Sequence, residues 1–529
     1  MPIARRRRTL TAATGLAGAA ALLFASAVTT SGATSAVAAM RPGAATAASG
    51  PVIRLIAAQR EVVTYRFGKD EYIDPSIWVA SFGSAFQLDV GRASYTKPVT
   101  VTEVIKTANG VVRRPLPSWV LSGWNGLRHF ARILVRNSSG RIVARRNMIF
   151  CPGGGELAKA TANAALTSRY PGECAPFDPF PLGAVWGIPR DWASEPFQYY
   201  VPGGVRPFHL KDGLYQLTMT ISPIYVRLFD VAKSGRTATV KVRIRRLPGP
   251  PPPKAASSPS APAAVPAHFV RVTAKTPAAT SRSRFPTART LTHPPASAEP
   301  DLVPLPSWDI TTTHQRKGDD DYLNFAATVW IGGNGPLDVE GFRTSSSRTM
   351  QAYQYFYQDG KLIGKAHVGT MGFANYNAWH FKQFAEYRLL NARKKVVVRS
   401  RKVGFCIAPT DGVDMLLRHA VWQPSYTGIS GNCGDLGALW VTETLPLGWG
   451  DTYVQTVPYQ NFEITDIPNG TYYIEIIANP EHLLYETNRH NDVSLRKIII
   501  GGTPGHRTVR VPAWHGIDPE NGKGSPYFF

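Results

Sequence analysis

Beyond its N-terminus, the 529-residue sequence has no apolar stretch long enough to cross a membrane, so no membrane span is expected. The N-terminal apolar run, from Leu16 to Val28, is short and rich in alanine. It follows the basic block Arg5–Arg8 and precedes the small-residue pattern Ala36-Val37-Ala38. These features are typical of a secretory signal peptide, which we predict at residues 1–39. We therefore expect a secreted, extracellular protein, soluble or associated with the cell wall, with Sec and Tat export both open.

The sequence also lacks the short motifs that assign common catalytic chemistries. It has no G-x-S-x-G nucleophile elbow and no H-E-x-x-H zinc motif, which argues against serine hydrolases and zinc proteases. The acidic stretch Gly318–Tyr322 lacks the spacing of an EF-hand calcium loop. The glycine run Cys151–Gly155 lacks the strand-to-helix context of a phosphate-binding loop.

Acidic residues are few relative to basic ones. The chain carries 59 Lys and Arg against 36 Asp and Glu, a formal net charge of +23 at pH 7. Outside a cell, such a charge favours anionic cell-wall polymers or acidic substrates as partners. Nucleic acid is not expected, because no nucleic-acid-binding motif is present. The alternative is a solvated basic surface without a polyanionic partner.

Cysteine is scarce, with only Cys151, Cys174, Cys406 and Cys433. An even number of cysteines in an exported chain predicts disulfides, and four cysteines allow three pairings. A zinc site is disfavoured, because neither a C-x-x-C motif nor a Cys/His cluster occurs.

A change of composition divides the chain into two halves. Residues 248–300 are rich in Pro, Ala and Ser and bury too little apolar surface to form a core, so we predict an extended linker. The first half then covers residues 51–247 and the second half residues 301–502, followed by a C-terminal tail at 503–529. Both halves contain short alternating runs such as "LYQLTMTISP" and "TYYIEIIANP", whereas helical periodicity is rare. We predict an all-β fold with two tandem β-sandwich-like domains.

The two halves also resemble each other. Trp124 and Cys151 are 27 residues apart in the first half, and Trp379 and Cys406 are 27 apart in the second. Later in each half, "DGLYQLTMTISP" matches "NGTYYIEIIANP". Matching motifs in the same order indicate an internal duplication. The duplication favours one disulfide in each half, Cys151–Cys174 and Cys406–Cys433.

Four motifs of the second half occur together in one known family. They are "WHFKQFAEYRLL", "RKVGFC", "LGWGDTY" and "FEITDIPNGTYYIEIIANP". In their order and spacing the second half resembles the catalytic domain of the lysyl oxidases, particularly their bacterial relatives. The resemblance implies a lysyl-oxidase-type β domain. It also implies a copper-dependent amine oxidase, an oxidoreductase that deaminates protein lysines or other primary amines and releases aldehyde, ammonia and hydrogen peroxide.

The resemblance further implies two cofactors, copper and lysine tyrosylquinone. The quinone is made from a lysine and a tyrosine of the chain, and the matching positions are Lys402 in "RKVGFC" and Tyr453 in "GWGDTY". We therefore predict Lys402 and Tyr453 as the catalytic and cofactor-forming residues.

The copper motif is where the sequence departs from the family. The family pattern is H-x-H-W-H or H-x-H-Y-H, and alternate residues of a strand lie on one side, so three imidazoles converge on one ion. Here the three positions are Tyr376, Ala378 and His380, so His380 is the one metal ligand predicted from the motif. Other histidines of the second half, His367, His419, His482 and His490, are candidates to complete a site after folding.

The first half departs further, since Asn125 matches His380 and Asn147 matches Lys402. We expect this half to be a degenerate, non-catalytic repeat. Two functions remain open: a copper- and quinone-dependent amine oxidase, and a pseudoenzyme that acts as a non-catalytic extracellular binding protein for anionic cell-wall polymers or proteins.

Overall fold

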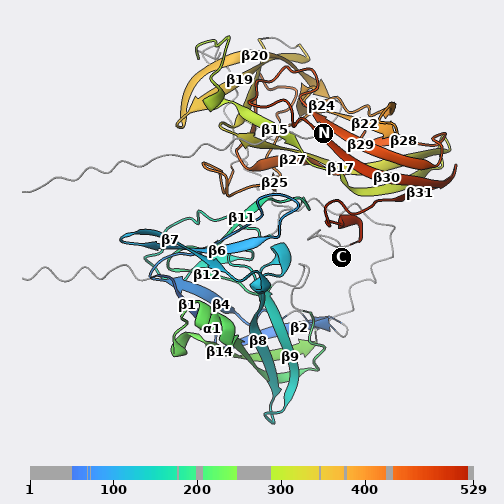
Figure 1. The fold of residues 1–529 in the computed structure, drawn as a ribbon. Coiled ribbons are helices and arrows are strands. Elements are labelled where there is room, and N and C mark those ends of the chain that lie inside the picture. The colour runs from blue at the N-terminus through green and yellow to red at the C-terminus, as the bar shows by residue number, and fades with distance from the viewer. Residues whose placement is uncertain are drawn as a thin grey trace, which may run out of the picture. The chain divides into compact units, whose positions relative to one another are not determined.

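Strands make up nearly all of the regular structure, because β-branched and aromatic residues alternate with polar ones along both halves. Figure 1 shows a computed structural model of the chain, which describes residues 50–67, 70–71, 73–174, 178–197, 206–246, 288–344, 347–374, 378–424 and 433–521. The predicted all-β fold is confirmed. The predicted signal peptide, residues 1–39, lies outside the described residues. Within them, no helix has the length and apolar character needed to span a membrane.

The described part of the first half contains the helix α1 (Pro223–Leu228), short 3-10 turns and fourteen strands. The strands are β1 (Val52–Ala57), β2 (Glu61–Phe67), β3 (Asp70–Glu71), β4 (Ile77–Phe82), β5 (Phe86–Gly91), β6 (Thr100–Thr107), β7 (Gly110–Leu116), β8 (Leu127–Asn137), β9 (Ile142–Phe150), β10 (Leu157–Lys159), β11 (Gly183–Ile188), β12 (Trp192–Ser194), β13 (Gly213–Ile221) and β14 (Thr237–Arg246).

The described part of the second half contains strands and short 3-10 turns. The strands are β15 (Pro300–Pro304), β16 (Trp308–Gln315), β17 (Asp320–Gly333), β18 (Leu337–Phe342), β19 (Thr349–Gln358), β20 (Lys361–Ala374), β21 (Ala378–Lys382), β22 (Ala385–Asn391), β23 (Val396–Arg399), β24 (Gly404–Phe405), β25 (Asp411–Gly412), β26 (Trp440–Leu445), β27 (Trp449–Tyr453), β28 (Asn461–Glu463), β29 (Gly470–Ala478), β30 (Val493–Thr503) and β31 (His506–Arg510).

Three sheets of each half share a common strand order. The order β1-β4-β12-β10 in the first half corresponds to β15-β17-β27-β25 in the second. The order β11-β5-β6-β7 corresponds to β26-β18-β19-β20, and β9-β8-β13-β14 corresponds to β23-β22-β29-β30. An internal duplication would produce this agreement, because each pair of matching strands comes from the same relative position in its half.

The predicted disulfide pairing is confirmed. Cys151 is bonded to Cys174 with their Cα atoms 6.0 Å apart, and Cys406 is bonded to Cys433 with their Cα atoms 5.8 Å apart. Each bond therefore lies within one half, as the repeated motifs indicated.

Strand β17 is buried on both faces, which explains its nearly continuous apolar sequence. Phe325, Ala327 and Val329 point into the main core of the second half. Ala326 and Trp330, on the opposite face, belong to a smaller apolar cluster that includes residues of the first half. This strand therefore lies between the core of the second half and the surface that meets the first half.

Two segments that composition assigned to the linker and the tail contain ordered structure. In the described end of the first segment, residues 288–300, Leu291 N–H donates to the Lys365 carbonyl of β20 at 2.8 Å, and Ala298 is fully buried. In the C-terminal segment, β31 pairs with β30, and Trp514 packs on Phe180 with ring centroids 5.3 Å apart.

The described residues all belong to one compact unit, Ala47–Phe529, in which the two halves make specific contacts. Leu182 N–H donates to the Val413 carbonyl at 2.7 Å, and Met415 N–H donates to the Gly183 carbonyl at 2.9 Å. Asp178 is completely buried and accepts a hydrogen bond from the Thr328 hydroxyl at 2.5 Å. These backbone and side-chain bonds join the two halves independently of the covalent linker.

Proteolytic cleavage within residues 248–287 should therefore leave the two halves associated. The fragments should coelute on size-exclusion chromatography and separate only in denaturant, because buried polar bonds and apolar contacts hold them together. Elution of two independent fragments at low protein concentration would contradict these contacts. A sample cleaved in 4 M guanidinium and kept there serves as the control for separated fragments.

Candidate functional site

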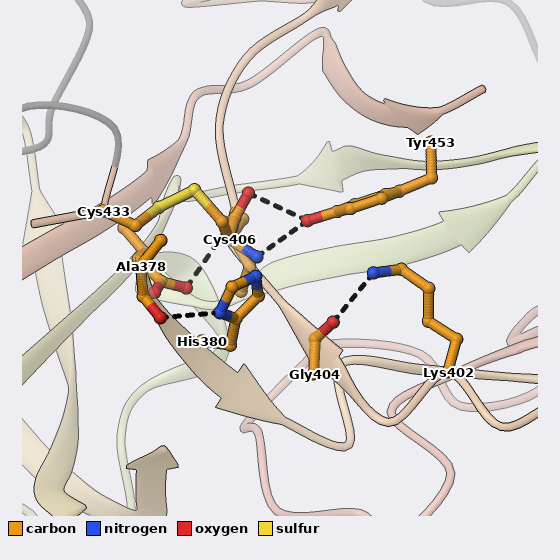
Figure 2. Close-up of a disulfide and its surroundings, with 9 residues drawn as sticks. Ala378, His380, Lys402, Gly404, Cys406, Cys433 and Tyr453 are labelled. Carbon is orange, nitrogen blue, oxygen red and sulfur yellow. Dashed lines mark hydrogen bonds between the residues drawn. A yellow bond between two sulfur atoms is a disulfide. The ribbon is translucent and has the colours of Figure 1, made fainter. Parts of the chain in front are cut away.

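The structure brings Lys402 and Tyr453 together. Tyr453 ends β27, where it pairs with Ala327 of β17, and Lys402 lies just before β24. The Lys402 Nζ atom lies 4.2 Å from the centroid of the Tyr453 ring and donates to the Gly404 carbonyl at 3.0 Å. Figure 2 shows that the Lys402 side chain reaches Gly404 and the Tyr453 side chain reaches Cys406, two residues further along the same backbone. The two residues that the resemblance pairs are therefore neighbours in the fold.

The Tyr453 hydroxyl is held by two hydrogen bonds to one residue. It accepts from Cys406 N–H at 2.7 Å and donates to the Cys406 carbonyl at 3.0 Å, as Figure 2 shows. Phe405 packs edge-on against the tyrosine ring, with ring centroids 5.2 Å apart. The Cys406–Cys433 disulfide anchors the same backbone. These contacts fix both the position and the plane of the Tyr453 ring.

Burial shifts the proton equilibria of both groups. It lowers the pKa of the Lys402 amine to about 8, and the Asp451 carboxylate partly opposes this shift. Burial also raises the pKa of the Tyr453 hydroxyl well above its ordinary value, and the nearby Asp451 and Glu443 add to this increase. At neutral pH the tyrosine is therefore protonated, while the lysine loses its proton more readily than an exposed lysine.

His380 lies beside this pair on β21, opposite Gly372 of β20. Its Nδ1 atom is 3.0 Å from the Ala378 carbonyl; since a carbonyl only accepts, Nδ1 carries the proton of this bond. Burial lowers the pKa of His380 to about 4, so the ring is neutral at physiological pH. The ring packs on Gly404, where an added Cβ would lie 3.1 Å from the His380 Cβ. The small residue in "RKVGFC" therefore makes room for the histidine.

Comparison with known proteins shows which family this region resembles. The sequence model of the lysyl oxidase family matches residues 371–505, which include His380, Lys402 and Tyr453. Residues 371–505 are therefore a lysyl-oxidase-type region. Lysyl oxidase homolog 2 from Gallus gallus is 28% identical over 110 residues, and its counterpart from Bos taurus is 27% identical over 110 residues. Each alignment covers 21% of this chain and 12% of the relative, so the chain spans about an eighth of the curated relatives it matches.

The residues present do not fit the copper centre that the lysyl oxidase family implies. His380 contributes one imidazole, the methyl group of Ala378 binds no metal, and Tyr376 lies outside the described residues. Among the residues that the structure describes, no group of three or more His, Cys, Asp or Glu side chains is placed to hold a metal ion. Copper in proteins prefers several nitrogen or sulfur donors.

The other histidines of the lysyl oxidase domain occupy other places. His367 and His482 line a cavity of about 490 Å³ together with Tyr485 and Arg489, and His367 Nε2 lies 2.9 Å from Gln351 Oε1. His419 lines a different cavity. His490 is exposed. None of these four histidines joins His380 in a group of three metal-ligating side chains within the described part of the chain.

The first half has neither of the matching side chains. Asn125 lies in a 3-10 turn (Gly123–Asn125), and Asn147 lies on β9, where it pairs with Arg132 of β8. An amide supplies neither an imidazole nor an amine, so this half offers no equivalent of His380 or Lys402.

Sequence reasoning missed two buried carboxylates beside the lysyl oxidase site. Asp451 and Glu443 are almost completely buried, and burial raises the pKa of each well above its ordinary value. One Glu443 oxygen accepts from Ile407 N–H at 3.1 Å. Asp451 precedes Tyr453 by two residues in "GWGDTY", which was the available signal, but its burial depends on the strands that pack around it.

The variant Lys402→Met should change how stability depends on pH. The pKa of Lys402 is lowered from 10.5 to about 8 on folding, so between these values the unfolded chain binds more protons than the folded chain. The free energy of unfolding of the wild type should therefore rise relative to the variant as pH increases from 8, by about 3 kcal/mol over the full window. Denaturant titrations at several pH values measure this difference.

The exposed Lys395 provides the matched control, since Lys395→Met removes the same charge from the surface. A stability difference between wild type and Lys402→Met that stays constant from pH 7 to pH 10 would show that the lysine is not held in a desolvated place.

Proposed function

We propose that this chain is an exported, non-catalytic member of the lysyl oxidase family that binds anionic polymers of the cell wall. The observation that carries the proposal is the sequence of the copper motif. His380 is its one histidine, and Tyr376 and Ala378 stand where the family has the other two. One imidazole is a poor copper site. The two disulfides support export, because such bonds persist in oxidising compartments.

In this proposal Lys402 and Tyr453 have a structural role. The hydroxyl of Tyr453 satisfies the backbone N–H and carbonyl groups of Cys406, which would otherwise lack partners close to the core. The Lys402 amine satisfies the Gly404 carbonyl and lies over the aromatic rings of Tyr453 and Phe405. These contacts account for both residues without any redox chemistry.

The charge of the chain supports an anionic partner. The excess of basic residues gives a formal net charge of +23, which remains strongly positive after removal of the four arginines Arg5–Arg8. A surface of one sign attracts polymers of the opposite sign from a distance and increases their rate of association. Anionic polymers of the cell wall are the partners of this charge that an exported protein meets.

A second function is favoured by one specific observation. Lys402 Nζ lies 4.2 Å from the centre of the Tyr453 ring. The quinone of the family would require its lysine and tyrosine to lie this close together. On this alternative the chain is an amine oxidase that acts on protein lysines or small primary amines and obtains copper ligands beyond His380.

Metal analysis distinguishes the two functions. After incubation with copper and dialysis, the wild type should retain far less than one copper per chain and release no peroxide from an alkylamine. The double variant Tyr376→His with Ala378→His should gain about one copper per chain, because the H-x-H-x-H spacing of an extended strand puts alternate side chains on one face. The control Tyr376→Gln with Ala378→Gln should gain none. Stoichiometric copper and peroxide release in the wild type would favour the oxidase.

Adhesion to isolated cell wall should depend on salt. Retention of the mature protein should decrease steeply between about 0.05 M and 0.5 M NaCl, because the screening length falls below the separation of surface charges. Pull-down with purified wall, compared with wall stripped of its anionic polymers, measures the effect. Retention that is unchanged by salt, or equal on the stripped wall, would contradict an electrostatic partner.

A further inference from the structure

The two halves line a cationic cavity of about 460 Å³ that is open to solvent and does not include Lys402 or Tyr453. Its walls include Asp89 and Arg113 from the first-half sheet, Arg169 from the segment after β10, and His419 and Trp422 from the second half. The volume lies in the range of small-molecule sites in proteins. We propose that this cavity binds the phosphate groups of an anionic polymer. The proposal rests on the proposed function and names the site and the ligand chemistry for it.

One side of the cavity is a face of the sheet formed by β5, β6 and β7. Asp89 pairs with Thr102, and Val104 pairs with Arg113, so Asp89 and Arg113 emerge on the same face as Lys106. The Arg113 guanidinium donates to Asp89 at 2.5 Å, and the Gln87 amide donates to the other oxygen of Asp89 at 2.9 Å. The carboxylate is therefore fully engaged, and it fixes Arg113 at the edge of the cavity.

Another side of the cavity holds a second guanidinium that packs beside two aromatic rings. The Arg169 guanidinium carbon lies 4.6 Å from the centroid of the Trp422 ring and 5.7 Å from that of the Tyr170 ring. The two rings are nearly parallel, with centroids 5.7 Å apart. Tyr170 is fixed in turn, because its hydroxyl donates to Gln87 at 3.1 Å. Aromatic stacking positions Arg169 while its N–H donors remain available to a ligand.

The charges around the cavity do not balance. Asp89 is the one carboxylate among the described residues that line it, and Arg113 already pairs with it. No ion pair joins Arg169 to a carboxylate within the described part of the chain. Lys106 is a third cation, which does not line the cavity but lies on the same sheet face, close enough to interact with the charges of Arg169 and Asp89. Three cations around one carboxylate leave a surplus of positive charge that a bound anion would neutralise.

A phosphate group matches this surplus better than a single carboxylate. It presents several oxygens in different directions, so one group can accept from the Arg169 and Arg113 guanidiniums together, whereas a carboxylate presents two oxygens in one plane. His419 is exposed at the same opening and adds a further donor. A polymer with repeated phosphates would extend from the cavity across the basic surface.

Binding of a fluorescent polyphosphate chain to the full mature protein tests the proposal, measured by anisotropy at about 0.05 M NaCl. Arg169→Gln should weaken binding about ten-fold or more, as expected for loss of a charged hydrogen-bonding group. Arg169→Lys should recover only part of the loss, because lysine lacks the planar fork. Arg132→Gln removes one equal charge from an exposed position on β8 and should change the affinity less than two-fold.

The outcomes separate this site from the proposed function. Equal affinities for Arg169→Gln and Arg132→Gln would overturn the cavity as the binding site, while salt-dependent binding by the wild type would keep the proposed function. No binding by the wild type at this salt concentration would overturn both. Poly-glutamate binding as tightly as polyphosphate, with the same loss in Arg169→Gln, would overturn the choice of phosphate. Single-stranded DNA binding through Arg169 more tightly than polyphosphate would overturn the assignment to a wall polymer.

Discussion

The two hydrogen bonds between the Tyr453 hydroxyl and the backbone of Cys406 determine the arrangement of the candidate site. They join the end of β27 to the chain that leaves β24, and the Cys406–Cys433 disulfide holds the same backbone. With the tyrosine ring fixed, Lys402 and Phe405 have a flat surface to pack on, and the Gly404 carbonyl meets the lysine amine. His380 then occupies the space that Gly404 leaves open. The geometry is held by contacts that need no metal ion.

These contacts explain why Lys402 and Tyr453 are present although positions 376 and 378 of the copper motif are not histidine. A buried polar group that loses its partner costs about 1–3 kcal/mol, so replacement of Tyr453 would leave the backbone of Cys406 unsatisfied. Replacement of an imidazole ligand at position 378 by Ala removes metal affinity but leaves no buried polar group without a partner. Selection for folding alone would therefore preserve the tyrosine more strongly than the histidines. The closeness of Lys402 and Tyr453 therefore does not by itself indicate activity. The two positions of the copper motif that are not histidine argue more strongly against activity.

The sequence predicted those features that depend on local pattern. Alternation along runs such as Gly470–Ala478 predicted the strands, and repeated motifs predicted both disulfides. The resemblance located Lys402 and Tyr453 in neighbouring motifs. It could not predict that Asp451 and Glu443 are buried beside them, because burial depends on strands that are distant in the sequence. The contacts between the halves, and the stacking of Arg169 on Trp422, were equally hidden, since each joins residues at least 150 positions apart.

Peptide-mapping mass spectrometry tests most directly the claim that Lys402 and Tyr453 are packing residues. The mature protein is incubated with copper and air, digested, and searched for the peptides that contain the two residues. Both peptides should be recovered separately with unmodified masses, before and after the incubation. A single crosslinked peptide that joins Lys402 to an oxidised Tyr453 would contradict it. Such a peptide would establish that the second half makes the quinone of its family with ligands beyond His380.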